Sequence, residues 1–194
     1  MKYSKEDIEI INNNPFLRKG EAQIIKDIML MLPKNPSILE IGTFKGKTAI
    51  LMAKTRPDSN IITIDPHYGI PDHQEISSSF EAVIKNIISE NLLHQIIHIK
   101  TNSQLYTPTK KFDLIFIDGG HTYNDVKHDF EKFKHYCKEE GIIAFHDYGI
   151  YHTAIIGVTK FCDSINVKKQ IGGTICFFKK NQIEENLVEN KDGN

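Results

Sequence analysis

Apolar positions along the chain follow two alternating patterns. Short, nearly continuous apolar runs are typical of strands covered on both faces of a sheet. Apolar residues at every third or fourth position are typical of amphipathic helices. The continuous runs predict strands at residues 37–41, 61–65, 96–100, 113–118, 142–147 and 175–180, with a weaker one at 165–171. The periodic segments predict helices at residues 20–32, 47–55, 77–92, 122–137 and 153–164.

The alternation of strands and helices predicts parallel β-α-β units and an α/β fold. The end of the chain differs, because Gly172-Gly173 lies between two extended runs and favours a hairpin turn. We therefore expect a doubly wound, Rossmann-like sheet that is mostly parallel and ends in an antiparallel strand. A single domain over residues 1–180 is expected, with residues 1–19 as an N-terminal cap segment and residues 181–194 as a polar tail.

Composition narrows the range of partners. The net charge is −1 over 194 residues, which gives no electrostatic case for nucleic acid or an anionic membrane. No apolar run approaches the roughly 20 residues that a membrane span requires, and the first residues are too polar for a signal peptide. Cys137, Cys162 and Cys176 fit neither a disulfide framework nor a zinc spacing. We expect a cytoplasmic protein.

The end of the first predicted strand carries the strongest sign of a ligand. In open parallel sheets, ligands bind at the carboxyl ends of strands, where the strand order switches. Here Glu40 is followed by a turn containing Gly42 and Gly46. A dinucleotide fingerprint would have a glycine where Phe44 stands, and the Walker spacing is absent, so NAD and P-loop readings are disfavoured. Because a carboxylate repels phosphate, a ligand with a positive centre fits Glu40 better.

Asp65 ends the second predicted strand. A carboxylate about 20 residues after the first glycine can accept hydrogen bonds from both hydroxyls of a ribose. An alternative role is a turn-initiating aspartate before Pro66. With Glu40 and Asp65 in this order, the sequence predicts a nucleoside ligand.

Four segments together resemble the successive motifs of class I S-adenosylmethionine-dependent methyltransferases. The likeness is greatest to the small O-methyltransferases of the methyltransferase 24, macrocin and catechol types, and it covers roughly residues 20–180. The segments are "ILEIGTFKGKTA", "IITIDPH", "FDLIFIDGGHTY" and "GIIAFHDY".

The resemblance implies a seven-stranded sheet with an antiparallel last strand, and S-adenosylmethionine as the cofactor. It implies that the turn over residues 42–46 holds the methionine part, that Asp65 holds the ribose, and that Asn102 and Ser103 lie beside the adenine. The cofactor-binding residues expected on this basis are Glu40, Gly42, Thr43, Gly46, Thr48, Asp65, Asn102, Ser103 and Asp118.

Asp118, His146 and Asp147 end the fourth and fifth predicted strands. Two carboxylates and an imidazole can hold a divalent cation such as Mg²⁺. Catechol-type relatives have an Asp-Asn pair at the second position, so His146 is a departure that leaves Mn²⁺, Fe²⁺ and Zn²⁺ open. The alternative is that Asp118 bonds backbone amides and that no metal is held.

His121 lies three residues after Asp118, where catechol-type enzymes have a lysine base. An imidazole titrates near neutrality and can accept a hydroxyl proton. A purely structural histidine at a helix start is the alternative. His67 is a further candidate for the acceptor pocket or the metal site. We therefore expect Asp118 and His121 to be catalytic.

The expected reaction is O-methylation of a small molecule such as a sugar, a phenol or a natural product. The alternatives are a metal hydrolase and a SAM-binding regulatory or structural protein without transferase activity. A homodimer is compatible with these observations.

Overall fold

The computed structural model describes residues 19–68 and 78–183. The predicted cap segment lies, apart from Lys19, outside the described residues, as do residues 184–194 of the predicted tail. Residues 181–183 form a helical turn, and Ile183 packs against the core. Within the described ranges, no helix combines the length and apolar character needed to cross a membrane.

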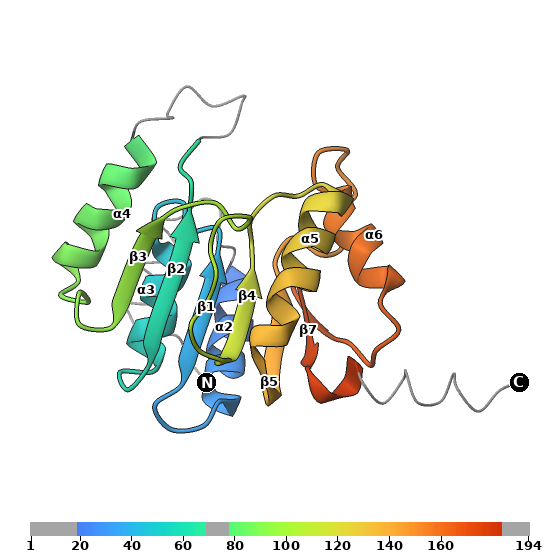
Figure 1. Cartoon of the computed structure of the whole chain (residues 1–194), viewed down its shortest axis with the longest axis horizontal. Coiled ribbons are helices and arrows are strands. Elements are labelled where there is room, and N and C mark those ends of the chain that lie inside the picture. The colour runs from blue at the N-terminus through green and yellow to red at the C-terminus, as the bar shows by residue number, and fades with distance from the viewer. Residues whose placement is uncertain (1–18, 69–77, 184–194) are drawn as a thin grey trace, which may run out of the picture.

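Seven strands form one sheet, in the order β3-β2-β1-β4-β5-β7-β6 (Figure 1). The first five strands along the chain pair in parallel, β7 runs antiparallel to β5, and β6 runs antiparallel to β7. The predicted fold class is therefore confirmed. The strands are β1 (Ser37–Ile41), β2 (Asn60–Asp65), β3 (Ile96–Lys100), β4 (Phe112–Ile117), β5 (Cys137–Phe145), β6 (Gln170–Gly172) and β7 (Ile175–Lys179).

The helices cover both faces of the sheet. Helices α2, α3 and α4 pack on one face, and α5 and α6 pack on the other. Side chains alternate between these two layers along each strand, so that Ile38 faces the first layer and Leu39 the second. The helices are α2 (Lys19–Met31), α3 (Lys47–Thr55), α4 (Ser78–Ser89), α5 (Tyr123–Phe133) and α6 (Ile156–Ser164), with a 3₁₀ turn at Lys134–Tyr136.

Two predicted boundaries differ from the structure near the carboxyl-terminal half. The predicted helix over residues 122–137 ends at Phe133, and β5 already begins at Cys137. The weak run over residues 165–171 contributes only its last two residues to β6. Both segments are largely polar where the predicted and observed boundaries differ. The apolar pattern therefore does not mark the residue at which strand pairing begins.

Candidate functional site

The predicted site residues lie at the carboxyl edge of the parallel strands. The chain moves outward from β1 to β2 and β3, and then returns to the other side of β1 to form β4. The strand order thus switches between β1 and β4, and the upward arrowheads of β2 and β3 point to this edge in Figure 1. Ligands of open parallel sheets bind at such switch points.

The glycine turn after β1 packs directly on the end of β4. Gly42 has a φ of 92°, and a Cβ there would overlap the carbonyl oxygen of Asp118. Gly46 has a φ of 78° and precedes α3, while Thr48 is half-buried in the first turn of that helix. Only glycine meets both conditions at residue 42, a left-handed backbone and a close approach. This turn therefore forms the floor of the switch point.

Asp65 ties the end of β2 to the glycine turn. Its Oδ2 accepts hydrogen bonds from the backbone amides of Thr43 at 2.9 Å and Phe44 at 2.8 Å. Its Oδ1 accepts one from the amide of His67 at 2.6 Å. Each carboxylate oxygen has two lone pairs, so Oδ1 keeps one position for a further donor. A ribose hydroxyl would fit that position.

Glu40 is fully buried beneath the turn. Its Oε2 accepts a hydrogen bond from Thr63, whereas its Oε1 has no hydrogen-bond partner among the residues that the structure describes. Burial raises the pKa of Glu40 to about 8; the Thr63 bond opposes this, and the charges of Asp118 and Asp65 add to it. A buried acceptor without a donor is costly. The site is therefore suited to a ligand that brings a cationic donor.

The loop after β3 is held by its own polar groups. Asn102 Oδ1 accepts a hydrogen bond from the amide of Leu105 at 2.9 Å, and the Ser103 carbonyl accepts one from Lys132 Nζ at 2.8 Å. Asp129 on α5 lies beside Ser103, and burial raises the pKa of this carboxyl to about 6 although the Ser103 bond lowers it. Asn102 and Ser103 therefore shape the loop, and their contact with adenine stays a prediction.

Asp118, His121 and Asp147 come together on the other side of the switch point. One ligand atom from each lies within 4.8 Å of the others. His121 Nε2 is 3.0 Å from Asp147 Oδ2, and this bond raises the pKa of His121 against the lowering effect of burial. Burial would raise the pKa of Asp147, but its bonds to the two histidines, His121 and His146, lower it on balance. Asp147 also has a φ of 63°, a backbone strain of the kind found at functional sites.

His146 lies in a ring of three carboxylates. Its Nδ1 is 3.1 Å from Asp118 Oδ1 and 3.3 Å from Asp147 Oδ1, and its Nε2 is 3.5 Å from Glu21 Oε2. Burial lowers the pKa of His146, but these carboxylates more than reverse the effect and raise it well above its ordinary value. Asp118 and Asp147 are thus the bonding partners of Nδ1, whereas the buried Nε2 has no hydrogen-bond partner among the described residues.

The geometry therefore differs from the predicted metal set of Asp118, His146 and Asp147. His121, predicted as the base, presents the third ligand atom. His146 instead holds the two aspartates in place. His67 is not part of this cluster of ligand atoms.

Glu21 was missing from the predicted site. It is 2% exposed, comes from the first turn of α2, and also accepts a hydrogen bond from Thr174 Oγ1 between β6 and β7. The signal in the sequence was a charge on an apolar stripe, because Glu21 lies four residues before Ile25 and seven before Ile28, both buried. A carboxylate at such a position needs an internal partner.

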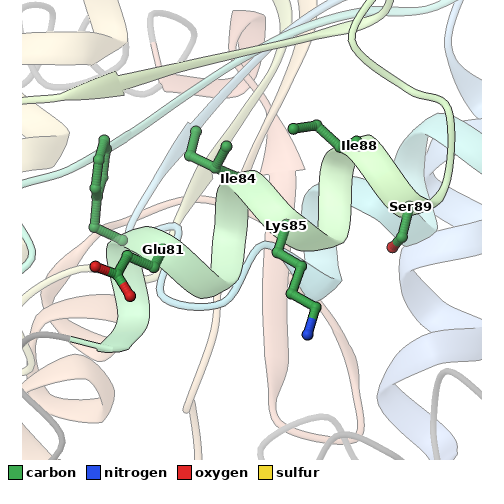
Figure 2. A pocket seen from close by; sticks show the side chains of 6 residues that line it. Glu81, Ile84, Lys85, Ile88 and Ser89 are labelled. Atoms are coloured by element: carbon green, nitrogen blue, oxygen red, sulfur yellow. The ribbon is translucent and has the colours of Figure 1, made fainter.

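The hollow drawn in Figure 2 lies elsewhere. Ile84 and Ile88 project from one side of α4 and Lys85 projects from another. The residues that line this hollow are Phe80, Glu81, Ile84, Lys85, Ile88 and Ser89. None of the predicted site residues is among them, so the candidate site remains the strand edge.

The sequence profile of a family described as a methyltransferase domain, Methyltransf_24, matches residues 39–148. The chain belongs to this methyltransferase family. The match spans every predicted site residue from Glu40 to Asp147, but neither Glu21 nor Thr174.

The chain also resembles an uncharacterized protein, R132, of Acanthamoeba polyphaga mimivirus. The two are 34% identical over 121 residues, which is 58% of this chain and 52% of the viral protein. The chain thus spans about half the length of the curated relative that it matches.

Solved structures share the fold of this chain. A Klebsiella pneumoniae protein, proposed to be an O-methyltransferase, has a TM-score of 0.66 at 15% identity, over 91% of this chain and 90% of that one. The O-methyltransferase NovP has a TM-score of 0.65 at 16% identity, over 81% and 78%. A Bacillus cereus O-methyltransferase in complex with SAH has a TM-score of 0.62 at 16% identity, over 92% of both chains. At such identities the likeness shows the fold alone.

Proposed function

We propose that this chain is a SAM-dependent methyltransferase that methylates a hydroxyl oxygen of a small molecule. The observation that carries the proposal is the buried Oε1 of Glu40, an acceptor without a donor, at the switch point of a chain in a methyltransferase family. SAM supplies an electrophilic methyl group on a sulfonium. O-methylation is favoured by the names of the structural relatives, two of which are O-methyltransferases.

The residues around the switch point fit the cofactor in the predicted order. Glu40 Oε1 would accept a hydrogen bond from the ammonium group, the turn over residues 42–46 would lie against the methionine part, and Asp65 Oδ1 would accept a hydrogen bond from a ribose hydroxyl. Thr43, Thr48, Asn102 and Ser103 complete this proposed surface. The carboxylate of Asp118, a residue that lies next to the turn, would stabilise the positive charge of the sulfonium.

His121 and Asp147 form the proposed base. Asp147 holds the imidazole through its Oδ2, as an orienting carboxylate does in general acid–base pairs. Because the pKa of His121 is raised above its ordinary value of 6.5, the imidazole becomes neutral only at a higher pH. The rate of methyl transfer should therefore rise with pH through a value above 6.5.

The carboxylates and the imidazole of this cluster also fit a divalent cation. Asp118, His121 and Asp147 would hold it, with two carboxylate oxygens and one imidazole nitrogen. Such an ion lowers the pKa of a hydroxyl bound to it. His121 would then be a ligand, and the acceptor hydroxyl would need a weaker base.

Isothermal titration calorimetry tests the cofactor. We expect SAM and SAH to bind and NAD to show no heat of binding. Glu40→Gln keeps the shape but removes the charge, and should weaken SAM binding by about 10- to 100-fold, the range of a charged hydrogen bond. Binding of NAD without binding of SAM would overturn the proposal.

A second assay tests the chemistry. SAH formation is measured with sugars, phenols and other hydroxyl acceptors, with added Mg²⁺ or with a chelator. Asp118→Asn should lower the turnover by about 10²- to 10³-fold with the fold unchanged. Full turnover in that variant would remove Asp118 from the site. SAM binding without turnover of any acceptor would favour a regulatory SAM-binding protein, and activity unaffected by the chelator would exclude the metal.

A further inference from the structure

A continuous chain of hydrogen-bonding side chains, here called the relay, runs from the first turn of α4 to the carboxyl group beneath the glycine turn. Five of its members are buried and His98 is half-buried. In order along the relay, its members are Ser79, His67, His98, Thr43, Thr63 and Glu40.

Every link of the relay is within hydrogen-bond distance. His67 Nδ1 is 2.9 Å from Ser79 Oγ, and His67 Nε2 is 2.9 Å from His98 Nε2. His98 Nδ1 is 3.3 Å from Thr43 Oγ1, which is 2.5 Å from Thr63 Oγ1. Thr63 then reaches Glu40 Oε2. A neutral imidazole and a hydroxyl each carry one hydrogen that can be donated. The direction of the hydrogen bond in one link therefore fixes its direction in the next link.

With Glu40 as a carboxylate, the order of the relay has one solution. A carboxylate only accepts, so Thr63 donates to Glu40 and Thr43 donates to Thr63. Thr43 has then used its only hydrogen, so it accepts from His98, whose hydrogen must be on Nδ1. His98 Nε2 is therefore an acceptor for His67 Nε2–H, and His67 Nδ1 accepts from the Ser79 hydroxyl.

Both imidazoles are neutral in this arrangement. Burial lowers the pKa of His67 and of His98, to which Lys100 adds at His67 and His67 adds at His98. Asp65 opposes this at both rings, and a hydrogen bond with the Thr63 backbone also opposes it at His98. The nearest carboxylate contact, from Asp65 Oδ1 to His67 Nδ1, is 3.8 Å. A second proton on His98 would also set two N–H groups against each other across the 2.9 Å link between the rings, and a second proton on His67 would break the hydrogen bond that Ser79 donates to its Nδ1.

With Glu40 as a carboxylic acid, the order reverses. Its Oε1 has no hydrogen-bond partner among the described residues, so the acid hydrogen belongs on Oε2, facing Thr63. Thr63 then donates to Thr43, and Thr43 donates to His98 Nδ1. The hydrogens of His98 and His67 consequently move to Nε2 and Nδ1, respectively.

The charge of Glu40 therefore selects the order of the relay. The groups that face Glu40 are Thr63 from β2 and the carboxylates Asp118 and Asp65. Burial and these two charges place the pKa of Glu40 at about 8, so the acid predominates at neutral pH in the free protein. A cation beside Oε1 would favour the carboxylate instead.

We propose that cofactor binding reverses the relay, so that the ammonium group of the cofactor ionises Glu40 and both imidazoles exchange tautomers. This inference rests on the proposed function. The Glu40 O–H bond breaks, each bridging hydrogen passes to its neighbour's side of the link, and one proton leaves to solvent. Nothing is oxidised or reduced. His67 and His98 act as positioning residues, which make the first turn of α4 respond to the cofactor.

The first test needs no cofactor. Nitrogen-15 NMR distinguishes Nδ1–H from Nε2–H in each imidazole of the free protein, measured between about pH 6.5 and 9.5. We expect His98 to change from Nε2–H to Nδ1–H, and His67 from Nδ1–H to Nε2–H, near pH 8, where Glu40 ionises. Tautomers that stay fixed over this range, or a charged ring in either residue, would overturn the inference.

A matched pair of substitutions tests the path. Thr63→Val keeps the branched shape in β2 but removes the hydroxyl, so both tautomers should lose their dependence on pH near 8. Thr63→Ser keeps the hydroxyl and should retain that dependence. The same reversal in Thr63→Val as in the natural chain would show that Glu40 does not act through this link.

The cofactor test holds the pH at about 6.5, where an amino group is still charged. SAM and SAH should reverse both tautomers, whereas 5′-methylthioadenosine, which lacks the ammonium group, should leave them unchanged. SAM binding without reversal would overturn this inference and leave the proposed function intact. No SAM binding, with the pH-driven reversal still present, would overturn the proposed function and with it the cofactor's part in the reversal.

Discussion

Four histidines near the carboxyl edge of the sheet form two pairs whose pKa values are shifted in opposite directions. On the side of β2 and β3, burial lowers the pKa of His67 and His98. On the side of β4 and β5, carboxylates raise the pKa of His121 and His146 despite burial. His67 and His98 bond mainly to hydroxyls and to each other, whereas His121 and His146 bond to carboxylates.

The difference shows that burial alone does not set the charge of a histidine in this fold. The number of carboxylates within bonding distance decides it, because each one offsets part of the cost of burying an imidazolium. One half of the edge can thus change its hydrogen-bond order without gaining charge on its rings, while the carboxylates of the other half keep its histidines charged to a higher pH. Substitutions in either half, or at the contact between them, should break this difference, and their expected effects decrease in the order given.

Removing the imidazolium should have the largest effect. His146→Gln leaves Glu21, Asp118 and Asp147 facing one another, and should lower the free energy of unfolding by about 3–5 kcal/mol, as when one partner of a buried ion pair is lost. Because the pKa of His146 is raised in the folded chain, its contribution is complete below its ordinary pKa of 6.5 and is lost only as the pH rises toward the folded value. Urea unfolding at pH 7 measures the loss.

Two further variants make this prediction sharper. His94→Gln changes an exposed histidine and should shift the free energy of unfolding by no more than about 0.5 kcal/mol. Adding Glu21→Gln to His146→Gln should recover part of the loss, because it removes one of the unpaired carboxylates. Equal stability of His146→Gln and the natural chain would mean that the ring is not charged.

The contact between the two halves gives the next largest effect. Gly42→Ala combines a left-handed backbone with an overlap against the Asp118 carbonyl, and should cost about 3 kcal/mol in unfolding free energy. Gly149 is the matched control, because it has a φ of 79° but open space where a Cβ would lie. Gly149→Ala should cost about 1 kcal/mol. Similar losses in the two variants, measured by urea unfolding, would contradict the close packing of the turn on β4.

The pH dependence of SAM affinity tests the side of the edge that contains His67, His98 and Glu40. Because the cofactor needs Glu40 as a carboxylate and the pKa of Glu40 is about 8, the dissociation constant should fall by about tenfold for each pH unit between about 5.5 and 7.5. Glu40→Gln should bind SAM weakly, with little dependence on pH. Calorimetry over this range, where the amino group of SAM stays charged, measures both slopes. A flat profile for the natural chain would indicate that Glu40 is already ionised.

The smallest expected effect is a change in one titration. Asp147→Asn removes the carboxylate whose bond is the main cause of the raised pKa of His121, so that pKa should fall. His121 would then resemble the histidines of the other half. NMR titration of His121 measures the change, with Asp58→Asn as a control, because Asp58 pairs instead with Arg56. An unaltered His121 titration in Asp147→Asn would contradict the ion network.

The fold and the strand ends could be predicted from the sequence because both depend on local patterns. Apolar runs locate the strands, and parallel strands bring their carboxyl ends to a common edge. Glu40, Asp65, Asp118 and Asp147 lie at that edge as expected. The apolar pattern of α4 was less informative, since Ile88 is exposed although it lies one turn after Ile84, while Val83 is buried.

The protonation states could not be predicted from the sequence. His146 has the ordinary appearance of a metal ligand beside an aspartate, and only its three carboxylate neighbours, one of them from α2, raise its pKa above the ordinary value. His98 lies inside β3 without any motif around it, and its partners, His67 and Thr43, come from the loops after β2 and β1. Such contacts join residues far apart in the chain, so a local pattern carries no trace of them.

The position of Glu21 has a practical consequence for choosing the limits of a fragment. A shorter piece cut to the recognised family region, residues 39–148, would retain every motif yet lose the carboxylate that completes the surroundings of His146. Thr174, which anchors that carboxylate, would be lost from the opposite end. Expression trials and alignments of related chains should therefore start upstream of α2 and extend through β7, or they will omit the outer supports of the acidic cluster.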